Sequence, residues 1–181
     1  FRPISLVLNI LTQPSKSLKE SSLTNKIMTK GQVVAGDFSK IVMRIKSTEQ
    51  VELGELVVIE DGEEKFILQV YDLVYGSQIS QQNLEMVSGM NLEQGEFQIM
   101  DESLRNYQLA FLKPILTVSK TSKMCKKLPS FFAKVREIHK EDLSFITLPE
   151  NPLFLGNLRS GSRMMDFTIS LPGKDVLSHH V

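Results

Sequence analysis

The sequence has one cysteine, no tryptophan, no net charge and no long apolar run. A lone Cys125 cannot form an internal disulfide or a cysteine-rich zinc site, and it fits a reducing compartment. No stretch approaches the 18 or so consecutive apolar residues that a membrane-spanning helix needs, so we expect a soluble protein. Residues 1–30 lack the pattern of a secretory leader. Together these absences predict a cytoplasmic protein.

Patterns typical of enzymes are also missing. No serine stands in a G-x-S-x-G elbow, and Cys125 has no histidine near it in sequence. Gly156 and Gly161 have the spacing of a phosphate loop, but Ser162 replaces the lysine that must reach the phosphates, so we favour a turn. The adjacent His179 and His180 would point to opposite sides of a strand and fit no metal spacing. We expect no catalytic, cofactor or metal site, and an enzyme whose residues converge only in space remains an alternative.

What the sequence does contain is a glycine-punctuated stretch of strands from Gly31 to Gly76. Ile41, Met43 and Ile45 alternate with more polar residues, which predicts a half-buried strand. Leu56 to Ile59 is a continuous apolar run, typical of a strand covered on both faces. The Asp-Gly at 61–62 suits a tight hairpin turn before a long strand over 66–75. On that strand we expect a core-facing set of alternating side chains, namely Phe66, Leu68, Val70 and Val74.

The flanking segments complete the expected architecture. Residues 1–27 are interpreted as an N-terminal arm or connector, in which 4–11 could add a strand to another sheet, and 28–181 as the barrel domain. A helix with Ser80 as N-cap is predicted to end at Gly89 and to cover an open end of the barrel.

The second half of the chain supplies further strands and turns. A strand from Tyr107 is expected to end, or to lie at an edge, near Pro114, because proline cannot donate to a ladder. Further strands are expected over 131–138 and 165–171, with a short helical turn within 141–148. An extended connection at Pro149 and Pro152 and a turn over 156–161 precede the last strand. The fold class that follows is mostly β, a small closed antiparallel barrel of six or seven strands with one or two short helices.

Charge is unevenly distributed along the chain. Residues 49–102 contain thirteen acidic residues against one basic, and residues 113–140 contain eight basic residues against one acidic. We expect these two segments on different sides of the barrel, where they could join neighbouring copies in a ring, although solvated loop faces are the plainer interpretation. The candidate acidic inter-subunit face is Glu52, Glu60, Asp61, Glu63 and Glu64. The candidate contacts to nucleic acid or a partner are Lys120, Lys123, Lys126, Lys127, Lys134 and Arg136.

Two phenylalanines lie within the basic segment. Small barrels bind single-stranded nucleic acid through basic grooves and stacked aromatic rings, so Phe131 and Phe132 make such binding an alternative function. Consecutive phenylalanines entering a strand are more often core residues, and we expect them to be buried.

The last thirty residues resemble a known family. The run PLFLGNLRSGSRMMDFTISLPGKDVLSHHV, over 152–181, is similar to the segment that closes the N-terminal barrel of HerA-type hexameric DNA translocases. The resemblance extends over about residues 28–181 and is weakest in the middle. The matching turn residues are Gly156, Leu158, Arg159, Gly161 and Ser162, and the matching lead-in residues are Gly173, Ser178, His179 and His180. The opening strands match at Gly31, Gln32, Val33, Phe38 and Ser39.

The resemblance implies a barrel of the HAS type that acts without catalysis. Such a barrel would serve assembly of a hexameric ring and docking of a NurA-like nuclease in DNA end resection, with double-stranded DNA passing through the whole ring. The resemblance places a RecA-like ATPase core after Val181, so we expect no ATP hydrolysis by these residues. ATP and Mg²⁺ would belong only to that core.

Overall fold

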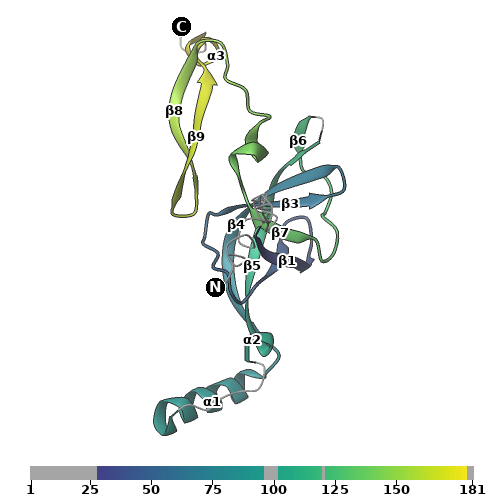
Figure 1. Ribbon diagram of the computed structural model, residues 1–181, viewed down its shortest axis with the longest axis vertical. Helices are drawn as coiled ribbons and strands as arrows, with labels where there is room; N and C mark the ends of the chain where they lie inside the picture. The colour runs from purple at the N-terminus through teal and green to yellow at the C-terminus, as the bar shows by residue number, and fades with distance from the viewer. Residues whose placement is uncertain (1–27, 96–101, 120, 179–181) are drawn as a thin grey trace, which may run out of the picture.

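The computed structural model describes residues 28–95, 102–119 and 121–178, and its centre is a closed antiparallel barrel (Figure 1). The strands follow the order β2-β1-β7-β3-β4-β5, and a further pairing of β2 with β5 closes the circle. The six barrel strands are β1 (Thr29–Gly36), β2 (Ile41–Ile45), β3 (Leu56–Asp61), β4 (Glu64–Ser77), β5 (Asn106–Val118) and β7 (Lys134–Glu137). One extra strand, β6 (Ser122–Met124), pairs with the end of β5. The predicted fold class is confirmed.

Side chains fill the interior of the barrel. Ile41, Met43 and Ile45 of β2 are buried as their alternation predicts, and they pack with inward side chains of β3, β4, β5 and β7. Gly31 is needed where β1 crosses β2, because a Cβ there would lie 2.3 Å from the Arg44 carbonyl oxygen. The barrel is therefore a packed core rather than a ligand cavity.

β3 is buried on both faces, as its continuous apolar run predicts. Val57 and Ile59 belong to the interior of the barrel, whereas Leu56 and Val58 belong to a second cluster outside it. This second cluster includes Leu143, from the short 3-10 helix η1 (Lys140–Leu143) that confirms the expected helical turn. Gly62, with φ 62°, forms the tight turn from β3 into β4.

The prediction for β4 was wrong at one position. A β-bulge between Val70 and Asp72 shifts the alternation by one residue, so Leu73 rather than Val74 packs against the core. β5 also departs from expectation, because it continues through Pro114 instead of ending there. β2 pairs with β5 as far as Leu112 and β6 begins to pair at Leu116, so Pro114 lies between two partial neighbours, next to a second bulge.

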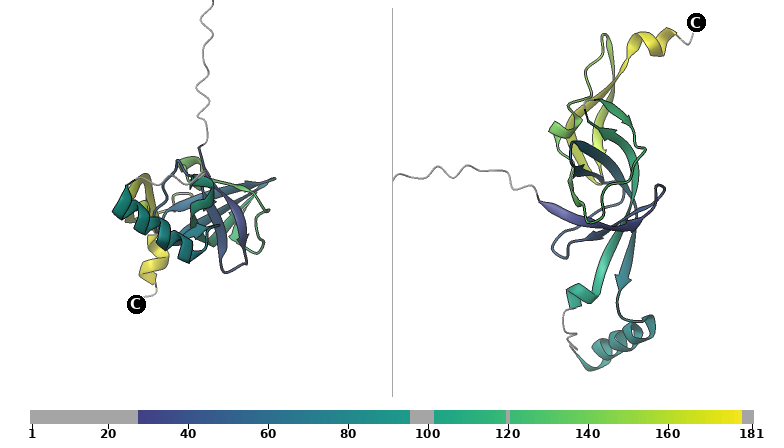
Figure 2. Two further views of the ribbon diagram at one scale, coloured as in Figure 1. Left: turned by 90° about the horizontal axis from the view of Figure 1, so that it is seen from below. Right: turned by 90° about the vertical axis from the view of Figure 1, so that its right-hand side faces the viewer.

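The predicted helix exists, but it does not cover the barrel. Ser80 is the N-cap of α1 (Gln81–Gln94), as expected, and the helix continues through Gly89 to end at Gly95. A single interior glycine costs only about 1 kcal/mol, which the remaining turns absorb. The paired ends of β4 and β5 run past the barrel and carry α1 and the short α2 (Glu102–Arg105) away from it (Figures 1 and 2).

The C-terminal strands do not close the barrel, contrary to the expectation from the sequence. β8 (Pro152–Ser160) and β9 (Arg163–Pro172) form a separate two-stranded sheet, followed by α3 (Gly173–Ser178). Residues 152–160 are thus a strand rather than an extended connection and a turn, and the turn is confined to Gly161 and Ser162. Closure by β2 and β5 leaves no free position in the barrel for the last strand. We call the β8–β9 hairpin the arm.

Some predicted features lie outside the described residues, namely the strand at 4–11, the connector to residue 27, Lys120 and the pair His179 and His180. Among the helices that the structure describes, none combines the length and the apolar character needed to cross a membrane.

Candidate functional site

The basic segment is divided between exposed and buried side chains. Lys123, Lys126 and Lys134 are exposed, on β6, the following loop and the start of β7. Lys127 is exposed but pairs with Glu64, with 3.1 Å between Nζ and Oε1. Arg136 is buried. Only part of the predicted basic stripe is therefore available to an outside ligand.

Phe131 and Phe132 are exposed, so the expectation that they are core residues was wrong. Their side chains are 61% and 62% exposed, and the rings meet edge to face with centroids 4.6 Å apart. We call this pair the aromatic knob. Phe132 has φ 63°, the left-handed region that a bulky residue rarely adopts. This turn shortens β7 to residues 134–137 and directs the two rings away from the barrel interior.

The knob is held by backbone hydrogen bonds to β1. The Phe132 N–H donates to the Val33 carbonyl oxygen over 2.9 Å, and the Val33 N–H donates to the Ala133 carbonyl oxygen over 3.0 Å. A strained backbone persists only where its surroundings enforce it, and such positions concentrate at functional sites. The knob combines an unfavourable conformation with unfavourable exposure, which makes it the strongest candidate for a binding contact.

The acidic segment lies against the basic one, so the expectation of two separate sides was wrong. The Ser130 N–H donates to Asp61 Oδ2 over 2.7 Å, which places the tip of the β3–β4 hairpin beside the lysine loop. Hydrogen bonding from Ser130 lowers the pKa of Asp61. Because antiparallel pairing puts β3 next to β7, the ends of these strands meet although they are far apart in sequence. The surface around the knob is thus of mixed charge.

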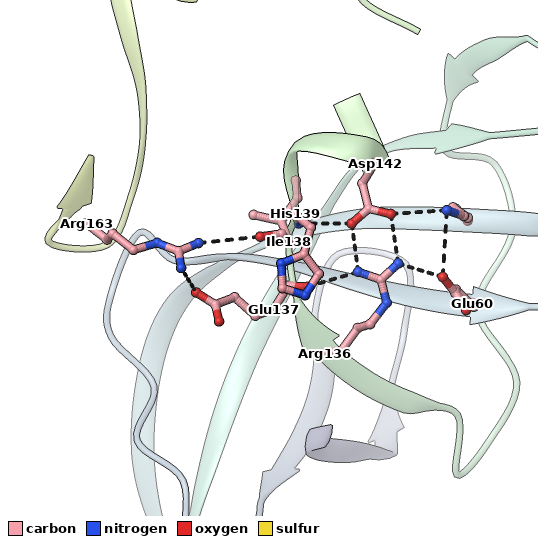
Figure 3. A network of polar contacts seen from close by, with 8 residues as sticks. Glu60, Arg136, Glu137, Ile138, His139, Asp142 and Arg163 are labelled. Carbon is pink, nitrogen blue, oxygen red and sulfur yellow. Dashed lines mark hydrogen bonds and ion pairs between the residues drawn. The ribbon is translucent and has the colours of Figure 1, made fainter. Parts of the chain in front are cut away.

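A buried ion-pair network lies where β7 meets η1 (Figure 3). Arg136 donates two hydrogen bonds of 2.7 Å to Asp142 and one of 2.5 Å to Glu60. Lys65 donates to the Asp142 carboxylate over 3.1 Å, and the His139 N–H donates to it over 3.0 Å. A charge buried here is compensated on every side, which fixes η1 to the barrel.

The network changes the pKa values of its members. Burial by itself would raise the pKa of Asp142, but the hydrogen bonds from Arg136, His139 and Lys65 outweigh it and hold that pKa well below its usual range. The hydrogen bond to Asp142 raises the pKa of Arg136, and the hydrogen bond from Arg136 lowers that of Glu60. All three groups are held in their charged forms. Arg136 is therefore a structural residue in this arrangement, not a phosphate contact.

Sequence reasoning did not single out Asp142. Its position three residues after His139, whose backbone N–H it accepts, is half of a capping box and was the available signal. Without the fold, nothing in the local sequence links it to Arg136.

The conserved-looking turn of the arm is an anchor to the barrel. Ser160 Oγ accepts a hydrogen bond from the buried Leu56 N–H over 2.9 Å, and the Ser162 N–H donates to Glu52 over 2.6 Å. Arg163 pairs with Glu137 and reaches the Ile138 carbonyl oxygen (Figure 3). Hydrogen bonding from Ser162 lowers the pKa of Glu52. The turn residues thus hold one end of the arm on β3.

Four of the five predicted acidic residues have partners within the chain. Glu52 accepts from Ser162, Glu60 from Arg136, Asp61 from Ser130 and Glu64 from Lys127, and Glu63 is exposed at the hairpin tip. Their role toward a neighbouring copy stays a prediction, and their first role is to join segments of this barrel.

No side-chain cluster with the chemistry of a catalytic centre was found in the described ranges 28–95, 102–119 and 121–178. Those ranges contain no group of three or more His, Cys, Asp or Glu residues placed to hold a metal ion. Cys125 is buried, and its thiol donates to the Lys127 carbonyl oxygen over 3.1 Å. The grooves on the surface are open, the largest being about 650 Å³ between the 45–50 loop and the start of β5.

Comparison with known proteins adds no relative to this picture. No protein-family model matches the chain. No curated protein matches it either.

Proposed function

We propose that this chain is the non-catalytic barrel of a HerA-like DNA translocase and that it acts in ring assembly and in docking a NurA-like nuclease during DNA end resection. The barrel interior is filled by side chains, so its function has to reside on its surface. The observation that carries the docking role is the aromatic knob, because two exposed phenylalanines on a strained backbone are costly unless a partner covers them.

The surroundings of the knob fit a protein partner. Protein interfaces have an aromatic or apolar centre and a polar rim of both charge signs. Phe131 and Phe132 form such a centre, with Lys127, Glu64 and Asp61 close to the loop that carries them. Because acidic residues engage much of the basic segment, the rim offers little net positive charge to a phosphate backbone.

Titration calorimetry with a NurA-type nuclease from the same genome tests the docking role. We expect binding by the chain, and a loss of at least about tenfold in affinity for the double variant Phe131→Ser, Phe132→Asn, because aromatic hot spots contribute roughly 2 kcal/mol or more. Met86→Ser, which alters an exposed apolar residue on the distant α1, is the matched control and should bind normally. Failure of the unaltered chain to bind, or equal binding by the knob variant, contradicts the docking role.

Single-stranded nucleic acid binding is the second candidate function. The exposure of both phenylalanine rings, with the exposed Lys134 two residues from Phe132, favours it, since bases stack on such rings. Fluorescence anisotropy with an oligothymidine measures it over a range of salt concentrations. This function requires affinity that falls steeply with salt and falls again in Lys126→Glu and Lys134→Glu variants. Salt-independent or absent binding removes it.

A further inference from the structure

The half of the arm that lies away from the barrel exposes a continuous apolar run. Leu153, Phe154 and Leu155 follow one another on β8 with side chains 45%, 65% and 60% exposed. A β-bulge falls at Leu155, between the pairs Phe154–Ser170 and Gly156–Ile169. An isolated two-stranded hairpin is at best marginally stable in water, and three successive apolar residues on its surface make it less so. This half of the arm therefore requires a cover.

Both outer edges of the arm lack a strand partner among the described residues, since β8 and β9 pair only with each other. Natural sheets protect open edges with charged residues, yet 152–158 of β8 and 167–172 of β9 contain none. The charges begin near the barrel, at Arg159 and Asp166. An uncharged open edge is suited to pairing with another strand rather than to staying in solvent.

A groove runs along β9 on the other side of the arm. Its volume is about 270 Å³, and it lies between β9 and the segment that follows η1. Ile146, Leu148 and Phe167 give it an apolar floor, and the pair Lys140–Asp166 closes one end at 3.5 Å. Ser170 lines the groove too, and its buried Oγ has no hydrogen-bond partner within the part of the chain that the structure describes. The groove thus combines apolar surface with unmet hydrogen-bonding capacity next to an open strand edge.

The chain cannot place its own β8 run in its own groove. Phe154 is paired with Ser170 across the ribbon, so β8 lies on the opposite side of β9 from the groove. The arm is also held by its turn, through Ser160 to Leu56 and through Ser162 to Glu52, which prevents it from folding back. An occupant must therefore come from another molecule.

We propose that this occupant is β8 of a second copy of this chain, whose apolar run at 153–155 lies in the β9 groove of its neighbour. Each copy offers one uncharged β8 edge and one groove beside an uncharged part of β9, so the two surfaces match without charge repulsion. The contact joins different surfaces of the two copies, and a contact of this kind closes into a ring when the rotation between copies allows it. The inference rests on the assembly role proposed above and names the surfaces that carry it.

Disulfide trapping between two singly substituted full-length chains tests the contact. Leu155→Cys places a thiol on the β8 run and Thr147→Cys places one at the groove, both in a Cys125→Ala background whose thermal transition is first compared with that of the unaltered chain. We expect the mixture to form a disulfide-linked pair at least about tenfold faster than either variant alone. Leu104→Cys mixed with Thr147→Cys is the control, because Leu104 is exposed on α2 at the other end of the molecule (Figure 1).

Light scattering on the unaltered chain separates the two ways of failing. If the chain is oligomeric but the Leu155–Thr147 pair links no faster than the control pair, another surface assembles it and the arm contact is wrong. If the chain is a monomer up to millimolar concentration and no pair links, both the arm contact and self-assembly by this chain are overturned. Faster linking together with an oligomer supports the arm contact.

Discussion

Phe66 and Phe154 both lie in β-strands among apolar neighbours, yet Phe66 is 2% exposed and Phe154 is 65% exposed. Phe66 belongs to β4, whose pairing on both sides helps to close a barrel around a filled interior. Phe154 belongs to the arm, whose two strands pair only with each other. The same residue type in the same local conformation is thus core in one region and surface in the other. The difference teaches that sheet closure, and not strand character, decides which apolar residues this chain can bury by itself.

The comparison predicts its largest effect at the two phenylalanines. Phe66→Ala should lower the free energy of unfolding by about 4 kcal/mol, because it leaves a cavity in a closed core. Phe154→Ala should change it by less than about 0.5 kcal/mol when the chain is dilute, since an exposed side chain has little to lose. Urea denaturation of both variants measures the contrast. A similar loss in both would mean that the arm is packed as tightly as the barrel.

The ion-pair network should rank second, because it joins η1 to the barrel. Asp142→Asn should cost about 3 kcal/mol at pH 7, since it leaves the buried Arg136 without its full partner. The native pKa of Asp142 is lowered, so the unfolded chain binds more protons and stability rises with pH. In the unaltered chain this stability should be lost as the pH falls below about 4, toward the native pKa.

Urea midpoints from pH 7 down to pH 2 test the network's pH dependence. The acid-side decline should be shallower in Asp142→Asn than in the unaltered chain. Glu141→Gln, a neighbouring exposed carboxylate, is the control and should follow the unaltered curve. Parallel curves for Asp142→Asn and the unaltered chain would show that Asp142 does not carry the acid sensitivity.

A smaller effect is expected where the arm meets the barrel. Ser160→Ala removes the acceptor of the buried Leu56 N–H and should cost about 1–2 kcal/mol. Amide exchange in β8 and β9 should rise more than exchange in the barrel strands, because the arm loses its anchor. Exchange that rises evenly throughout the chain would mean that arm and barrel unfold as one unit.

The smallest effect should be a gain. Phe132→Asn should stabilise the fold by about 1 kcal/mol, because asparagine tolerates the left-handed φ that strains phenylalanine. Phe131→Asn, at a residue without a positive φ, should give no such gain. The two melting temperatures, measured side by side, decide this. A loss of stability in Phe132→Asn would show that the knob packs on its own chain.

Local pattern predicted the parts of the fold that depend on neighbours in sequence. The alternation of Ile41, Met43 and Ile45, the two-sided burial of β3 and the N-cap at Ser80 all follow from periodicity or capping chemistry, and the structure confirms them. The barrel class could be predicted because strands joined by tight turns pair with each other.

Features set by distant pairing could not be predicted in the same way. The bulge at Val70 moved Leu73 into the core, and the pairing of β2 with β5 excluded the last strands from the barrel. The left-handed turn at Phe132 reversed the expected burial of the knob. The partners of Arg136 come from residues 60 and 142, so only the fold reveals why this arginine is not a free basic side chain.

Hydrogen exchange of the unaltered chain at low and at high protein concentration tests the central contrast most directly. The barrel is complete within one copy, whereas we infer that the arm is completed by a second. Amides of the buried strands β2, β3 and β4 should therefore be equally protected at both concentrations, and those of 153–157 and 167–171 should gain protection only at the higher one. Arm protection that is already strong at the lower concentration, and does not change at the higher, would contradict the account.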